Sequence, residues 1–179
     1  MAEHLLLVGM MGAGKSTVGR LVAARLGRPH VDTDSEVERR AGISVRAIFS
    51  TRGEESFRLE ESRVLAEVLA GDVPAVVSVG GGAVLDPADR MAMHDGGTVV
   101  WLRARPETLA RRVGRTDDRP LLAGAAGETT AVLARIEAER RPLYEEVAAE
   151  VIDVDGLTAT EVADRVLTLA STKSDGENR

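Results

Sequence analysis

Short apolar runs alternate with amphipathic segments along this chain, and the alternation predicts its secondary structure. The apolar runs predict strands near 4–9, 29–33, 74–79, 98–102 and 150–154. Between them, apolar residues recur at helical spacing and predict helices near 15–26, 35–41, 44–51, 54–70, 87–94, 106–113, 128–148 and 158–170. Strands that alternate with helices indicate an α/β fold, in which helices cover both faces of a parallel sheet.

Two segments depart from this alternation. Residues 35–70 contain helical patterns without a strand, which predicts an insertion large enough to form a second lobe. Residues 114–127 combine three glycines with charged side chains and have no apolar periodicity, which is typical of a mobile loop. We expect residues 1–170 to form a single domain and the polar residues 171–179 to be a disordered tail.

Two predicted helix starts have the spacing of a capping box, in which a hydroxyl and an acid three residues later cap the helix reciprocally. Thr158 and Glu161 form one such pair, and Ser35 and Glu38 form the other. We therefore expect Thr158 and Ser35 to be N-cap residues.

The most specific pattern is GMMGAGKST, residues 9–17, which follows the first predicted strand and is called the phosphate loop below. Its glycines let successive backbone N–H groups turn toward an anion, and the next helix adds the positive end of its dipole. Lys15 is expected to reach the β- and γ-phosphates of a nucleotide, and the Ser16 hydroxyl to bind Mg²⁺. The alternative is a chance glycine turn, but a strand before it and an amphipathic helix after it argue against that interpretation.

The second predicted strand ends in Val31-Asp32-Thr33-Asp34, which contains two carboxylates. Residues two apart in an extended chain point the same way, so Asp32 and Asp34 are expected to share one face at the carboxyl edge of the sheet. One could serve Mg²⁺ and the other a substrate hydroxyl. The alternative is that Asp34 only caps the next helix, which leaves Asp32 unexplained.

The third predicted strand leads through Ser78 and Val79 into Gly80-Gly81-Gly82, called the glycine segment below. Many phosphate-loop proteins carry an aspartate near the end of such a strand to assist Mg²⁺, and Ser78 stands there instead. Consecutive glycines let the backbone approach a ligand closely, although a flexible turn is the alternative.

Charged residues fall within the apolar stripes of two predicted helices and therefore need partners. In 54–70, Arg58 and Glu61 lie within the stripe and Leu59 lies outside it. These charges either pair along the helix or turn Arg58 toward a pocket, with Glu61 orienting it.

In the predicted helix 128–148, Arg140 lies within the stripe, Arg141 points away, and Pro142 can kink the helix beyond them. A second inward arginine indicates an anionic small molecule, because a guanidinium group binds a carboxylate bidentately. The alternative is an arginine whose charge reaches solvent.

Composition and charge disfavour several classes of function. The chain has 179 residues, of which 23 are basic and 29 acidic, and a formal net charge of −6, whereas nucleic-acid-binding proteins usually present a positive face. It contains no cysteine, and the apolar run 5–8 is too short for a signal peptide or a membrane span. We expect a cytoplasmic protein without nucleic-acid or membrane partners.

Together these motifs resemble the shikimate kinases over residues 4 to 165. The resemblance rests on GMMGAGKST, DTDSEVE, FSTRGEESFRLEE, GGG, RPLL and RRPLYEEVA. It implies a three-layer P-loop kinase fold with a five-stranded parallel sheet in the order 2-3-1-4-5, a substrate-binding insertion over about 33–62 and a lid over about 114–127. It also implies transfer of the γ-phosphate of ATP to the 3-hydroxyl of shikimate, on the route to chorismate and the aromatic amino acids.

The resemblance implies roles for the matching residues on the nucleotide side. Those that would contact the phosphates of ATP are Gly12, Ala13, Gly14, Lys15, Ser16 and Thr17. Ser16 would bind Mg²⁺ directly and Asp32 would bind it through water. Arg119 would be the catalytic arginine of the lid, whereas a solvated charged loop is the alternative for that segment. Arg112 would stack near the adenine.

On the acceptor side, Asp34 would hold the hydroxyl and act as the base. Arg58 and Arg140 would bind the carboxylate, and the glycine segment of Gly80, Gly81 and Gly82 would line the site. The adjacent Arg141 makes the second carboxylate ligand ambiguous within the family pattern, but the apolar stripe favours Arg140.

Three other functions stay open on the sequence: a gluconate kinase, a nucleotide kinase and a non-enzymatic nucleotide-binding regulatory module. A nucleotide kinase would leave Asp32 and Asp34 unexplained, and a complete acceptor pocket argues against a regulatory module. We expect a monomer that binds ATP, Mg²⁺ and shikimate.

Overall fold

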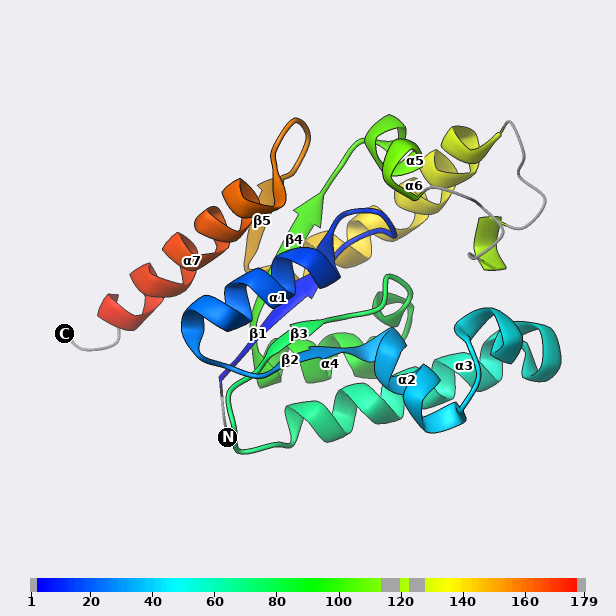
Figure 1. Ribbon diagram of the computed structural model, residues 1–179, viewed down its shortest axis with the longest axis horizontal. Helices are drawn as coiled ribbons and strands as arrows, with labels where there is room; N and C mark the ends of the chain where they lie inside the picture. The colour runs from blue at the N-terminus through cyan, green and yellow to red at the C-terminus, as the bar shows by residue number, and fades with distance from the viewer. Residues whose placement is uncertain (1–2, 114–119, 123–127, 177–179) are drawn as a thin grey trace.

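The structure is a computed structural model that describes residues 3–113, 120–122 and 128–176. Five parallel strands form one sheet in the order β2-β3-β1-β4-β5, as the resemblance to the shikimate kinases implied (Figure 1). The strands are β1 His4–Val8, β2 His30–Asp32, β3 Val76–Ser78, β4 Gly97–Arg103 and β5 Glu150–Asp153. Residues 5–8 and 98–102 are buried throughout, because helices cover both faces of the sheet, and this explains why these strands are continuous apolar runs.

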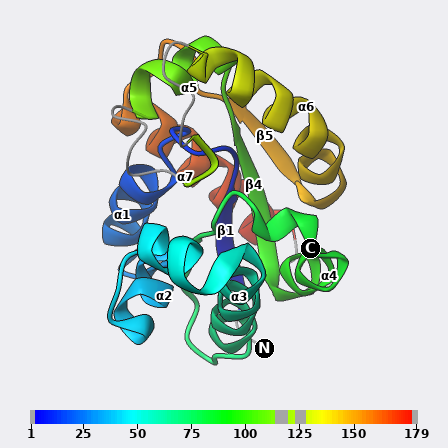
Figure 2. The same cartoon turned by 90° about the vertical axis from the view of Figure 1, so that its right-hand side faces the viewer.

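Helices form the two outer layers. They are α1 Lys15–Leu26, α2 Thr33–Ala41, α3 Val45–Leu69, α4 Pro87–Gly96, α5 Pro106–Val113, α6 Thr129–Val147 and α7 Ala159–Gly176, with short 3₁₀ turns η1 Ala83–Leu85 and η3 Pro120–Leu122. α1 and α7 cover one face of the sheet, and α4 and α6 cover the other together with the second half of α3 (Figures 1 and 2).

The insertion between β2 and β3 consists of α2 and α3, which project beyond the end of β2 (Figure 1). Gly53 interrupts α3 with φ 81° and ψ 167°, so the helix has two segments, as the separate patterns 44–51 and 54–70 predicted. A small apolar cluster joins the two helices, formed by Val37, Ile48, Phe57 and Val64. The insertion therefore has apolar packing of its own in addition to the main core.

Helix capping confirms one sequence prediction and corrects another. Thr158 and Glu161 form the predicted capping box, with the Glu161 N–H donating to Thr158 Oγ1 at 3.3 Å and the Thr158 N–H donating to Glu161 Oε2 at 2.7 Å. The predicted cap at Ser35 is wrong, because the helix starts two residues earlier. Asp32 is the N-cap of α2 and accepts a hydrogen bond from the Ser35 N–H at 3.1 Å.

The C-terminal helix also differs from its prediction. α7 continues to Gly176, beyond the predicted end at 170 and into the tail that was expected to be disordered. No glycine or proline interrupts residues 171–175, so the sequence contains no strong stop before Gly176.

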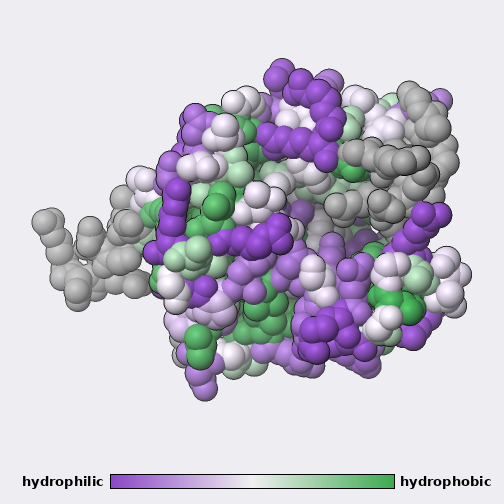
Figure 3. Space-filling view, viewed as in Figure 1, coloured by the Kyte–Doolittle hydropathy of each residue, from purple (hydrophilic) through white to green (hydrophobic). Residues whose placement is uncertain are grey.

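Hydrophilic residues are spread over the face shown in Figure 3, with smaller apolar areas between them, as the charged composition leads one to expect. The large apolar side chains that are exposed within the described ranges are dispersed over several elements, namely Leu59, Val73, Leu85, Met91 and Val151. Leu59 is 54% exposed, which agrees with its place outside the apolar stripe of α3. No described helix is both long and apolar enough to cross a membrane.

Candidate active site

The phosphate loop connects β1 to α1 and has the backbone shape that the glycine pattern predicted. Gly9, Gly12 and Gly14 have φ angles of 140°, 81° and 94°, a region that side-chain-bearing residues rarely enter. Lys15 folds back over the loop, and its Nζ donates to Gly9 O at 2.8 Å and to Met10 O at 3.1 Å. The loop thus places its lysine and the N-terminus of a 12-residue helix beside one pocket, an arrangement that suits an anion.

Asp32 and Ser16 meet at this pocket, called the phosphate pocket below. The Ser16 hydroxyl donates to Asp32 Oδ2 at 2.5 Å, while the other carboxylate oxygen caps α2. Asp32 therefore links the start of the insertion to the phosphate loop. Capping explains Asp32 after all, although the sequence interpretation considered capping only for Asp34.

Ser78, at the end of β3, bonds to the backbone at the end of the phosphate loop. It is buried, and its hydroxyl donates to Lys15 O at 2.9 Å. Because that hydroxyl has a single proton, His30 Nε2, which lies 2.9 Å from Ser78 Oγ, must be the donor in their hydrogen bond. Burial lowers the pKa of His30, more than the nearby Asp32 raises it, and this favours the neutral ring.

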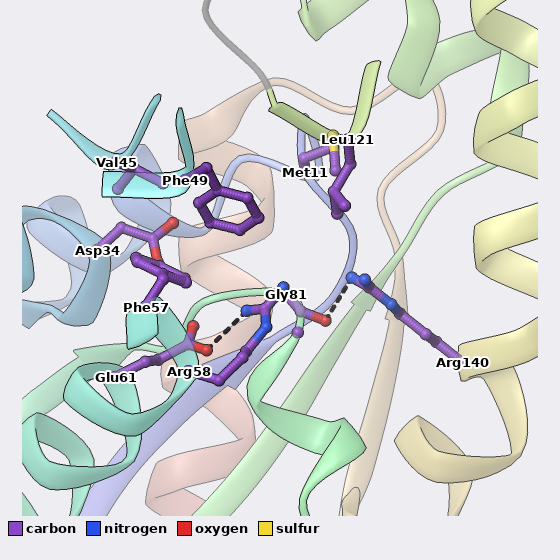
Figure 4. A pocket seen from close by; sticks show the side chains of 11 residues that line it. Met11, Asp34, Val45, Phe49, Phe57, Arg58, Glu61, Gly81, Leu121 and Arg140 are labelled. Carbon is purple, nitrogen blue, oxygen red and sulfur yellow. Dashed lines mark hydrogen bonds and ion pairs between the residues drawn. The ribbon is translucent and has the colours of Figure 1, made fainter. Parts of the chain in front are cut away.

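A second pocket adjoins the phosphate pocket and is called the acceptor pocket below (Figure 4). Its walls come from the phosphate loop, α2, α3, the glycine segment, η3 and α6. They are formed by Met11, Asp34, Val45, Phe49, Phe57, Arg58, Glu61, Gly81, Gly82, Leu121 and Arg140. Met11 and Asp34 also line the phosphate pocket, so the two pockets share a boundary.

Asp34 lies in the first turn of α2 rather than in an extended strand. The chain becomes helical at Thr33, so the alternation argument that grouped Asp32 with Asp34 does not apply to this turn. Both side chains nevertheless line the phosphate pocket, and Asp34 alone of the two also lines the acceptor pocket. The alternative role of Asp34 as the helix cap is wrong, because Asp32 is the N-cap.

Arg58 satisfies both interpretations of the charged stripe on α3. Its guanidinium group donates to Glu61 Oε2 at 2.7 Å and to Glu54 Oε1 at 3.1 Å, and it also lines the acceptor pocket. The Arg58 Cζ atom lies 5.2 Å from the ring centre of Phe57 and 6.0 Å from that of Phe49. The side chains of Glu54 and Glu61 and the two rings hold the guanidinium group, which favours a fixed orientation of the part that lines the acceptor pocket.

Arg140 approaches the glycine segment from the opposite side (Figure 4). Its side chain is 5% exposed, and Nη1 donates to Gly81 O at 2.9 Å. Arg141 is exposed and pairs with Glu137, so the helical phase predicted for these two arginines is confirmed. α6 continues through Pro142 to Val147.

The sequence interpretation did not assign two polar residues that support the site. Tyr144 is buried on α6, where its hydroxyl donates to Gly81 O at 2.7 Å and its ring stacks on Trp101 with centroids 5.4 Å apart. Thr33 was part of the DTD motif without a role of its own, and its Oγ1 accepts from the Gly80 N–H at 2.9 Å. The need of a buried tyrosine hydroxyl for a partner was a usable signal for Tyr144.

One other predicted residue, Arg112, is not brought into these pockets. Arg112 is exposed on α5 and donates to Val154 O at 3.1 Å and to Leu157 O at 3.4 Å, which ties α5 to the loop after β5. Arg119 lies outside the described residues, as does most of the predicted lid; of that segment, Leu121 contributes to the acceptor pocket.

Glu61 is a buried acid in the wall of the acceptor pocket. Its side chain is 1% exposed, and Oε1 has no hydrogen-bond partner within the part of the chain that the structure describes. Burial raises the pKa of Glu61 to about 7, although the charge of Arg58 opposes the shift, and the charge of Asp34 adds to it.

This raised pKa predicts how pH changes stability. Between the ordinary value of 4.5 and about 7, folded Glu61 keeps a proton that the unfolded chain has lost. The free energy of unfolding of the wild type, relative to Glu61→Gln, should therefore fall as pH rises through this window, by up to about 3 kcal/mol. Urea unfolding of both proteins from pH 4 to pH 8 measures this difference, and a flat or rising difference would contradict the assignment.

The fold and the two adjoining pockets define a P-loop kinase whose acceptor is a small molecule. The sequence model of the shikimate kinases matches residues 11–171. The shikimate kinase of Ruegeria pomeroyi is 45% identical over 174 residues, which are 97% of this chain and 87% of that protein. This chain belongs to the shikimate kinase family: it is an enzyme of aromatic biosynthesis that phosphorylates shikimate with ATP.

Solved structures agree with this assignment. The shikimate kinase of Acinetobacter baumannii in complex with shikimate superimposes with a TM-score of 0.91 and 36% identity, covering 97% of this chain and 95% of that one. A gluconokinase from Sinorhizobium meliloti has a TM-score of 0.59 and 18% identity over 98% of this chain and 95% of its own, and so shares the fold alone. The resemblance stated from the motifs is confirmed.

Proposed function

We propose that this chain transfers the γ-phosphate of ATP to the 3-hydroxyl of shikimate and that the side chains of the two pockets perform the transfer. The proposal rests on the position of Asp34, which borders both the phosphate pocket and the acceptor pocket. A hydroxyl held at Asp34 would face the γ-phosphate of a nucleotide bound at the phosphate loop, as phosphoryl transfer requires.

In the proposed reaction, a bond forms between the acceptor oxygen and the γ-phosphorus, and the bond from that phosphorus to the β–γ bridging oxygen breaks. ADP leaves, and Asp34 takes the proton of the acceptor hydroxyl. Lys15 and the N–H groups of the phosphate loop stabilise the negative charge of the transferring group.

The carboxylate of the acceptor is proposed to bind between Arg58 and Arg140. Both guanidinium groups reach the glycine segment, from opposite sides (Figure 4). Two anchored cations and one base suit a rigid cyclic acid better than a flexible sugar acid. The shikimate bound to the Acinetobacter baumannii relative supports this choice of acceptor.

Mg²⁺ is proposed as the metal that accompanies ATP. Ser16 Oγ and Asp32 Oδ2 lie 2.5 Å apart at the phosphate pocket, and hard cations prefer such oxygen ligands. Ser16 would bind the ion directly and Asp32 through water. When bound, the ion neutralises charge on the β- and γ-phosphates.

The remaining assignments follow from the resemblance. We propose Arg119 as the lid arginine that stabilises the transferring phosphate, and Arg112 as a neighbour of the adenine. We also propose a monomeric, cytoplasmic enzyme whose residues 33–62 bind the substrate.

A coupled assay of ADP release tests the proposed function. ADP release should depend on shikimate, stay near background with gluconate or without an acceptor, and stop when EDTA removes Mg²⁺. Phosphorus NMR of the product should identify a 3-phosphate ester. Equal rates with and without shikimate would contradict the proposal and favour slow ATP hydrolysis.

The neighbouring residues Arg140 and Arg141 allow a prediction with a matched control. Arg140→Ala should weaken shikimate binding by about 2–4 kcal/mol, because it removes a buried, charge-assisted contact. Arg141→Ala deletes an exposed neighbour on the same helix and should leave shikimate affinity within about twofold. Titration calorimetry on both variants, with ATP affinity as an internal reference, measures this; a loss confined to Arg141→Ala would reverse the assignment.

A further inference from the structure

The glycine segment is the common support of the proposed base and the proposed carboxylate ligands. Gly80 packs so closely on Asp34 and Glu61 that a Cβ atom would collide with both side chains. A Cβ atom on Gly82 would collide with the Arg58 guanidinium group, and Gly81 O accepts the hydrogen bond from Arg140. The position of this backbone therefore fixes how far the base lies from the two cations.

Two buried hydroxyls hold this backbone from different elements. Thr33 belongs to α2, is 0% exposed, and accepts from the Gly80 N–H at 2.9 Å. Tyr144 belongs to α6, is equally buried, and donates to Gly81 O at 2.7 Å. The stack of Tyr144 on Trp101 supports its hydroxyl from β4, a central strand of the sheet.

We propose that Thr33 and Tyr144 are positioning residues that lock the glycine segment, and thereby set the distance between Asp34 and the Arg58–Arg140 pair to match a rigid cyclic acid. Neither hydroxyl needs to touch the substrate for this role. The inference rests on the proposed function, because it assumes that Asp34 is the base and that the two arginines bind the carboxylate.

The position of each residue decides which kinetic constant it should affect. Thr33 immediately precedes Asp34, and its loss leaves a buried N–H group without its hydrogen bond next to the base. Tyr144 shares its acceptor, Gly81 O, with Arg140, so its loss should mainly disturb the carboxylate site. Neither residue lines the phosphate pocket itself, although Gly80 does, so the KM for ATP should change less than the kinetic constants for shikimate.

The test compares Thr33→Val, Thr33→Ser and Tyr144→Phe with the wild type in steady-state kinetics. Thr33→Val keeps the shape of the side chain and should lower kcat for shikimate by about tenfold or more, whereas Thr33→Ser restores the acceptor oxygen and should recover most of the activity. Tyr144→Phe keeps the ring stack and should raise the KM for shikimate by about three- to tenfold with little change in kcat.

Thr98→Val is the matched control. Thr98 is also a buried threonine, and its hydroxyl donates to Glu3 at 3.1 Å, but it lies at the amino end of β4, away from both pockets. This variant should change the melting temperature and leave the kinetic constants for shikimate within about twofold. It shows what loss of a buried hydroxyl does when only stability is involved.

Several outcomes would overturn the inference while leaving the proposed function intact. Thr33→Val could show wild-type kinetics, or Thr33→Ser could fail to recover activity. The variants could also raise the KM for ATP and the KM for shikimate by equal factors. If Thr33→Val does not fold, Thr33→Ser and Tyr144→Phe carry the test through their KM and kcat values. A wild-type enzyme without shikimate-dependent ADP release would instead overturn the proposed function itself.

Discussion

Asp34→Asn is expected to lower kcat with shikimate by about 10²–10⁴-fold, the usual range for loss of a general base. Asparagine keeps the shape of the side chain and one carbonyl oxygen, so it can still orient a hydroxyl but cannot accept its proton at neutral pH. The fold should persist, because Asp32 rather than Asp34 caps α2. Loss of one charge in the first turn should cost only about 0.3–1 kcal/mol of stability.

Single-turnover kinetics at saturating ATP and shikimate measure this prediction directly, with the melting temperature as a check on folding. Asp86→Asn is a suitable control, since Asp86 caps α4 with its own carboxylate and lies outside both pockets. It should change stability but not turnover. Near-normal turnover in folded Asp34→Asn would remove Asp34 from the role of base.

Lys15→Met is expected to lower kcat by about 10²–10³-fold, comparable to the loss of one donor aimed at the charge of a transition state. Methionine fills much of the same space without a charge. In this structure Nζ donates to Gly9 O and Met10 O, so the lysine side chain already lies against the phosphate loop, at the pocket where phosphates would bind. Turnover should fall more than shikimate affinity, because Lys15 does not line the acceptor pocket.

Arg20→Met provides the comparison, because Arg20 is an exposed cation on the same helix and lines neither pocket. Steady-state kinetics on both variants, together with shikimate binding by calorimetry, separate charge at the phosphate loop from charge elsewhere on α1. If both variants lose turnover equally, a general effect of positive charge, and not the position of Lys15, would explain the loss.

The sheet could be predicted from the sequence because strands covered on both faces must be apolar throughout, and such runs are short and distinct. Leu5-Leu6-Leu7-Val8 and Val99-Val100-Trp101-Leu102 show this pattern clearly. The inward phase of Arg58 and Arg140 was predictable for a similar reason, since helical spacing fixes which side chains share a face. Strand order came from the resemblance, because apolar patterns do not indicate which strands are neighbours.

Predictions failed where a short polar side chain could bond in more than one way. Asp32, Asp34 and Ser35 can all cap a helix, and only the geometry at the end of β2 selects Asp32. Long-range partners were a second cause of failure. Thr33 and Tyr144 bond to backbone groups 47 and 63 residues away, and no local pattern identifies those groups, although a buried tyrosine hydroxyl does indicate that some partner is needed. The lid prediction concerns residues 114–127, most of which lie outside the described part of the chain.

The insertion built from α2 and α3 has an evolutionary consequence. It supplies Asp34, Arg58 and both pocket phenylalanines, and its own apolar cluster holds its two helices together. The phosphate loop, by contrast, is anchored on β1 and α1 in the main core. Substitutions within this one contiguous stretch of sequence can therefore reshape one wall of the acceptor pocket without altering the phosphate loop, whereas the wall formed by Arg140 and the glycine segment lies outside the insertion.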